Sequence, residues 1–126
     1  RKVYPIDPAL IPVFDRSGKA NLGHALETCV LLELERRGAE IAYVRTARNI
    51  EVDFLARYPG GRQELIQVCT DLDESETRDR ETRALLDAAH EHPGASLHLV
   101  TLFPGTAANI PRPIRLHWAP AWLLGK

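Results

Sequence analysis

Three oxygen-bearing side chains of this chain occupy positions where apolar residues are expected. Asp53 lies within the otherwise apolar stretch 52–55, Gln67 lies within the otherwise apolar stretch 66–68, and Glu27 borders a helical apolar stripe. Carboxylate and amide oxygens are the hard ligands that Mg²⁺ prefers. A bound Mg²⁺ can activate water and stabilise the charge of phosphoryl transfer. The residue types therefore predict a Mg²⁺ site in which Asp53, Gln67 and Glu27 are metal ligands and catalytic residues.

The same side chains also have a structural interpretation. Asp53 can cap a neighbouring backbone group or pair with an arginine, and Gln67 can be a core amide bonded to backbone. Both interpretations stay open from these residues alone.

The turn between two predicted strands decides whether Asp53 and Gln67 meet. Segments 51–58 and 64–70 are rich in β-branched and aromatic residues, and the Pro-Gly-Gly sequence at 59–61 is typical of a turn between them. A three-residue loop over 59–61 places Asp53 directly opposite Gln67 on one side of the sheet. A four-residue loop would pair Asp53 with the residue after Gln67 and turn Gln67 to the other face. The site therefore requires a loop of odd length or a bulge.

The other segments alternate between helical and extended patterns. Apolar residues recur at helical spacing from Asn21, a candidate N-cap, to Gly38, and Asp73 with Glu76 can form the capping box of a second helix. This order predicts an α/β fold with a mixed sheet and helices packed on it. The predicted elements are a helix over 21–37, strands over 41–46, 51–58 and 64–70, a helix from 73 to before Pro93, a strand over 96–103 and a short strand near the C-terminus.

Length and charge limit the classes of function. The 126 residues fit one domain, and a formal net charge of -1 gives no electrostatic argument for nucleic acid or an anionic membrane. Arg78, Arg80 and Arg83 still form a local basic group, which predicts either a solvated salt-bridged face or a phosphate contact. No apolar run approaches the roughly 20 residues of a transmembrane helix, so no membrane partner is expected.

The two cysteines indicate the cellular compartment. Cys29 and Cys69 lie in apolar surroundings without CxxC spacing, which makes a structural zinc site improbable on spacing alone. We expect two reduced, buried thiols in a cytoplasmic protein. The chain contains no methionine and begins at Arg1, so we interpret it as part of a longer protein.

Three short motifs carry a resemblance to a known family. GHALETCVLLEL, NIEVDF and LIQV, in this order, resemble the PD-(D/E)XK nuclease-like domain at the C-terminal end of certain bacterial and archaeal AAA-type ATPases, a family of unknown function. The resemblance runs from about Val3 to near Phe103, and TRDRETRALLDA is similar to the helix after the third strand. It implies a restriction-endonuclease-like core of helix, three strands, helix and strand around a mixed sheet. It also implies DNA binding and an upstream ATP-binding ATPase domain in the same chain.

The resemblance divides the chain and assigns its motif residues. Residues 1–20 are then a lead-in from an upstream domain, and residues 21–126 are the nuclease-like domain. Glu27 matches the family's helix glutamate, Asp53 its motif aspartate and Gln67 its Glu-or-Gln position. The family's lysine falls at Cys69, which offers no cation, so we expect a catalytically degenerate site.

Other cations are candidates to replace that lysine. Lys19 is the only lysine near the first predicted helix, and Arg45 or Arg83 could stabilise charge. An arginine pKa above about 12 excludes it as a general base.

Three function classes follow. The first, which we favour, is a degenerate nuclease-like module that recognises nucleic acid or regulates the attached ATPase. The second is an active Mg²⁺-dependent nuclease domain, and the third is a protein-interaction module without nucleic-acid function. The chain contains no GxxxxGK[ST] phosphate loop, so the ATPase link rests on the resemblance.

Overall fold

The computed structural model describes residues 19–103 and 109–125. Residues 1–18 of the expected lead-in over residues 1–20 therefore lie outside the described residues. The first described helix begins at Lys19, inside the expected lead-in. The described elements are α2 (Lys19–Arg36), β1 (Glu40–Arg45), β2 (Glu51–Arg57), β3 (Gln63–Cys69), α3 (Ser75–Glu91), β4 (Ala95–Thr101), β5 (Arg115–Trp118) and α4 (Ala119–Leu123).

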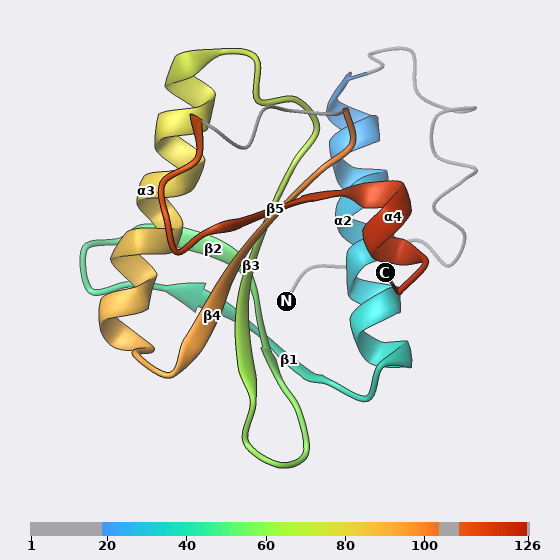
Figure 1. Cartoon of the computed structure of the whole chain (residues 1–126), viewed down its shortest axis with the longest axis vertical. Helices are drawn as coiled ribbons and strands as arrows, with labels where there is room; N and C mark the ends of the chain where they lie inside the picture. Colours follow the sequence, from blue (N-terminus) through green and yellow to red (C-terminus); the bar gives the residue numbers. More distant parts are fainter. Residues whose placement is uncertain (1–18, 104–108, 126) are drawn as a thin grey trace.

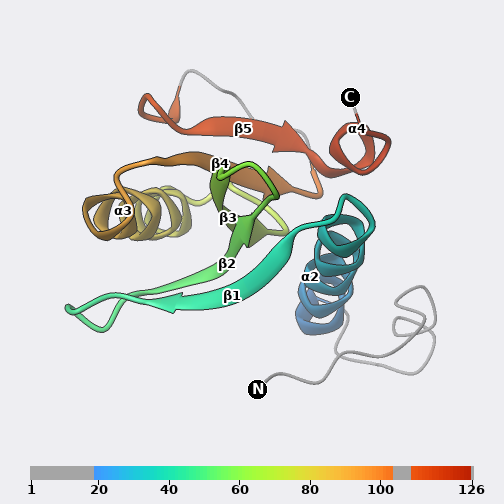
Figure 2. The same cartoon turned by 90° about the horizontal axis from the view of Figure 1, so that it is seen from below.

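The described strands form one mixed sheet in the order β1-β2-β3-β4-β5. The β1–β2 and β2–β3 pairs are antiparallel, whereas the β3–β4 and β4–β5 pairs are parallel. Helix α3 covers one face of the sheet, and α2 and α4 cover the other (Figures 1 and 2). The predicted α/β class with a mixed sheet is confirmed.

Each face of the sheet has its own apolar core. On the α3 face, Leu85 and Ala88 pack with sheet residues such as Leu65. On the α2 face, Val30 packs with residues that include Phe54. This alternation places successive β3 residues on opposite faces, so Gln67 lies on the same side as Leu65, toward α3.

Helix α2 ends where the sequence predicts. Gly38 has a φ of 86°, its N–H donates to the carbonyl of Glu35, and the next N–H, of Ala39, donates to the carbonyl of Leu34. These bonds satisfy the last carbonyls of the helix, and glycine adopts the positive φ without a steric penalty.

The β2–β3 turn has the odd length that the predicted site requires. The N–H of Tyr58 donates to the carbonyl of Arg62 over 2.9 Å, and Gly61 donates back to the carbonyl of Tyr58 over 3.1 Å. Residues 59–61 therefore form a three-residue loop. Its register pairs Arg57 with Gln63 and continues along the ladder toward the predicted pair.

The β2–β3 ladder stops one residue before that pair. Its last partners are Phe54 and Ile66. On its other side, β2 contains an irregularity, because Asp53 and Phe54 together lie opposite Tyr43 of β1. Such a bulge increases the local twist, and it opens the end of the ladder at the position of Asp53.

The start of the second helix differs from the prediction. Helix α3 begins at Ser75, and its N-cap is Glu74, whose side chain makes no capping bond. The predicted capping box of Asp73 and Glu76 is therefore wrong. The N–H of Asp73 instead donates to the Asp71 carboxylate over 2.9 Å, which forms a side-chain turn that delays the helix.

Candidate functional site

Asp53 and Gln67 bridge β2 and β3 at the open end of their ladder. The N–H of Asp53 donates to Oε1 of Gln67 over 2.8 Å, and Oδ2 of Asp53 accepts from the N–H of Val68 over 2.8 Å. The two side chains thus satisfy backbone donors that would otherwise lack ladder partners. Gln67 is only 7% exposed. The structure therefore brings together these two predicted site residues and shows the backbone contacts of the structural interpretation.

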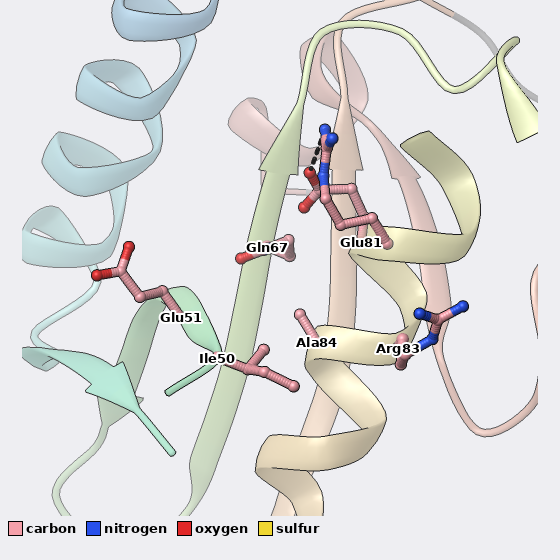
Figure 3. Close-up of a pocket in the computed structure, with 7 residues that line it drawn as sticks. Ile50, Glu51, Gln67, Glu81, Arg83 and Ala84 are labelled. Carbon is pink, nitrogen blue, oxygen red and sulfur yellow. Dashed lines mark hydrogen bonds and ion pairs between the residues drawn. The ribbon is translucent and has the colours of Figure 1, made fainter. Parts of the chain in front are cut away.

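Helix α3 adds two charged residues to this pair. The side chain of Gln67 also forms a hydrogen bond with Glu81, and Nη2 of Arg80 lies 3.5 Å from Oε1 of Glu81. Burial raises the pKa of Glu81, and the Gln67 hydrogen bond and the Arg80 charge oppose this effect. Figure 3 shows Glu81 projecting from α3 toward the end of β3, with Gln67 on that strand.

These residues border an open cavity of about 360 Å³ between α3 and the sheet. Its floor includes apolar atoms of Ile50 and Ala84, and its rim is charged (Figure 3). The lining residues are Ile50, Glu51, Gln67, Arg80, Glu81, Arg83 and Ala84. Arg80 and Glu81 place a cation and an anion side by side at this cavity, and such a pair can accept a charged ligand.

Glu27 belongs to the helix on the other face of the sheet. Its negative charge contributes to the raised pKa of Glu81, so the two carboxylates act on each other across the layers. The structure therefore joins Asp53 and Gln67 by hydrogen bonds, whereas Glu27 acts on the site through the effect of its charge on Glu81.

Oxygens of two of the predicted metal ligands already have backbone partners. Oδ2 of Asp53 and Oε1 of Gln67 each already accept a backbone N–H. Within residues 19–103 and 109–125, no three side chains of His, Cys, Asp or Glu are arranged to hold one metal ion. Mg²⁺ binding by Asp53, Gln67 and Glu27 stays a prediction.

Cys69, at the position of the missing lysine, carries a neutral thiol. Burial raises its pKa to about 11, and its Sγ donates to the carbonyl of Asp71 over 3.1 Å. Neither Cys29 nor Cys69 takes part in a disulfide, and both are only half-buried rather than buried as expected. At neutral pH, position 69 supplies neither a cation nor a thiolate.

Arg80, a member of the predicted local basic group, lines the cavity together with Gln67. Arg45 forms an ion pair with Glu51 instead, and Arg83 lines the cavity. The sequence predicts either a solvated salt-bridged face or a phosphate contact for Arg80, and the structure places this side chain against Glu81. A usable signal existed, because Arg80 lies four residues before the buried Ala84 and therefore at the edge of the helix's buried stripe.

No protein-family model matches this chain, and no solved structure matches it significantly. The chain is similar to an uncharacterized protein, MJ1544, of Methanocaldococcus jannaschii, with 44% identity over 75 residues. That match covers 56% of this chain but only 16% of the archaeal protein. The chain thus spans a small part of this relative's length. No helix among the described residues is both long and apolar enough to cross a membrane.

Proposed function

We propose that this chain is a nuclease-like module of a larger protein, which recognises nucleic acid through a degenerate active site. The observation that carries the proposal is the open end of the β2–β3 ladder. There Asp53 and Gln67 bridge the strands, and Gln67 lines a cavity together with Arg80 and Glu81. A helix, three antiparallel strands, a helix and a parallel strand are consistent with a restriction-endonuclease-like core.

The chemistry of the site supports recognition rather than cleavage. The oxygens of Asp53 and Gln67 are used to hold backbone N–H groups, and the thiol of Cys69 stays protonated near neutral pH. The guanidinium group of Arg80 beside Glu81 suits phosphate oxygens, which arginine binds through paired hydrogen bonds.

The context of the module is part of the same proposal. Much of the archaeal relative lies outside the matched region, which is consistent with a further domain in a longer chain. We assign an ATP-binding AAA-type domain to that region on the resemblance, with nucleic-acid recognition or regulation of the ATPase as the role of the module. Two free cysteines favour a cytoplasmic location.

The test measures binding and cleavage on the same samples. Fluorescence anisotropy of labelled single-stranded and duplex DNA and RNA, with the chain in Mg²⁺, Mn²⁺ or EDTA, gives the affinity, and denaturing gels detect cleavage. We expect binding with a Kd of about 1–100 µM that weakens with salt, in any of these buffers. We expect no cleavage.

Two results would change this conclusion. Metal-dependent cleavage that disappears in Asp53→Ala identifies an active nuclease. Absence of binding to every nucleic acid supports a protein-interaction module instead.

A further inference from the structure

Provided that the module binds nucleic acid as proposed above, one arginine stands out as the group that contacts phosphate. Arg80 and Glu81 are consecutive residues of α3, and both line the cavity. Their closest charged atoms are 3.5 Å apart, a distance at which an ion pair is weak. The pair therefore places a cation and an anion at the mouth of the cavity in a weak contact.

The two side chains differ in freedom. The side chain of Arg80 is 71% exposed, whereas that of Glu81 is 14% exposed. Glu81 is also held by Gln67 at the open end of the ladder. Arg80 can therefore leave Glu81 for another anion by a rotamer change in solvent, and Glu81 stays in place.

Other described arginines near the cavity or on α3 are placed differently. Arg78 donates to the carbonyl of Leu72, and Arg45 pairs with Glu51. Arg83 lines the cavity, but Arg80 acts electrostatically on the thiol of Cys69. Arg80 thus puts positive charge beside the strand position that has no cation of its own.

We propose that Arg80 is the cation with which this cavity binds a nucleic-acid phosphate, and that Glu81 competes with the phosphate for the same guanidinium. A phosphate offers the charge and the paired oxygens that a guanidinium binds best. When it arrives, Arg80 exchanges a weak carboxylate contact for a stronger phosphate contact. The Glu81 carboxylate therefore lowers the affinity of the site for phosphate by competing for Arg80.

The experiment is a double-mutant cycle on the affinity for a labelled single-stranded DNA oligonucleotide. Arg80→Ala should weaken binding about tenfold, the effect of losing one charge-assisted hydrogen bond. It should also lower the slope of log affinity against log salt by about one. Glu81→Gln, which keeps a hydrogen-bonding amide toward Gln67, should tighten binding. The double variant should match Arg80→Ala.

Two controls separate this mechanism from general charge effects. Arg57, an exposed arginine at the hairpin end of β2, is the matched control for Arg80, and Arg57→Ala should change affinity less than about twofold. Glu51→Gln removes another acid of the cavity mouth and should tighten binding less than Glu81→Gln. Equal thermal midpoints of all variants establish that each one is folded.

Each remaining outcome decides the question. Equal affinities for Arg80→Ala and Arg57→Ala overturn the role of Arg80 but leave the proposed function intact. If Glu81→Gln still tightens binding when Arg80 is absent, Glu81 acts by general repulsion and the competition is wrong. If neither the natural chain nor Glu81→Gln binds DNA or RNA, both the competition and the proposed function fail. Binding by Glu81→Gln alone supports the competition.

Discussion

At the scale of single residues, Asp53 and Gln67 act first as substitutes for β-ladder bonds. A side-chain oxygen of each residue accepts a hydrogen bond from a backbone N–H of the partner strand, at the point where β2 and β3 separate. A buried backbone N–H without a partner costs about 1–3 kcal/mol. The bridge therefore stabilises the shape of the open end, and any ligand that meets this pair meets oxygens that are already engaged.

The bridge predicts a stability difference between two substitutions. Asp53→Ala removes the acceptor of the Val68 N–H, so we expect the free energy of unfolding to fall by about 1–3 kcal/mol. Asp53→Asn keeps an oxygen acceptor and should lose less. Urea unfolding followed by circular dichroism measures both. Equal losses would show that the negative charge, rather than the hydrogen bond, is what Asp53 contributes.

At the scale of elements, the β2–β3 hairpin determines the site. Its loop uses Gly60 and Gly61 with φ of 96° and 95°, and it sets the register that brings Asp53 next to Gln67. An L-residue in such a conformation costs roughly 1–2 kcal/mol. Because the loop and the site occupy opposite ends of one ladder, loop strain is transmitted to the site as a change of register.

A substitution in the loop tests this dependence. Gly61→Ala should lower the free energy of unfolding by about 1–2 kcal/mol, because alanine disfavours the positive φ. Gly94→Ala is the control, since Gly94 has no positive φ and a Cβ there meets no atom within 4 Å. Thermal unfolding of both variants gives the comparison. A loss as large in Gly94→Ala would contradict the role of the backbone conformation.

The end of α2 and the position of the β2–β3 turn were predictable from the sequence, whereas the start of α3 was not. The position of the turn followed from Pro-Gly-Gly, and the end of α2 followed from Gly38, because both depend on the φ preferences of a few neighbouring residues. The start of α3 was not predictable, because the carboxylate of Asp71 competes for the N–H of Asp73. Two acids in one short segment offer alternative caps, and local propensity does not choose between them.

At the scale of the whole molecule, a second polar network joins three strands on the α2 face. Nδ1 of His98 lies 2.8 Å from Nε2 of His117, and Nε2 of His98 lies 2.7 Å from the hydroxyl of Ser96 and 3.5 Å from Glu64. Burial lowers the pKa of His98 to about 4, against the opposing charge of Glu64. Burial also lowers the pKa of His117. The β4–β5 contact thus depends on neutral imidazoles.

This network predicts how the stability of the whole domain depends on pH. The folded state holds the pKa of His98 near 4, whereas an unfolded histidine titrates near 6.5. The unfolded state therefore binds more protons between these values, and this contribution to stability is complete above about pH 6.5 and lost as the pH falls toward 4. Thermal midpoints measured across this range should fall with acidity.

The matched variant is His98→Asn, which removes the titrating ring. Its thermal midpoint should be lower than that of the natural chain at neutral pH, and the difference should narrow toward pH 4. A constant difference across the range would assign the pH dependence to groups other than His98, but not to Glu33. The ion pairs of Glu33 with Arg36 and Arg37 lower its pKa to about 2, so its contribution is lost only as the pH falls from about 4.5 toward 2.

The sequence by itself determined the α/β class, the position of the β2–β3 turn and the condition, an odd loop, under which Asp53 meets Gln67. These features follow from periodicity and turn chemistry, which act over short stretches of chain. Only the tertiary structure decided what surrounds the pair: the Arg80–Glu81 contact from α3, and the backbone groups that engage the oxygens of Asp53 and Gln67. Those contacts depend on where the ladder opens and how α3 packs over it, and both are set by residues distant in sequence.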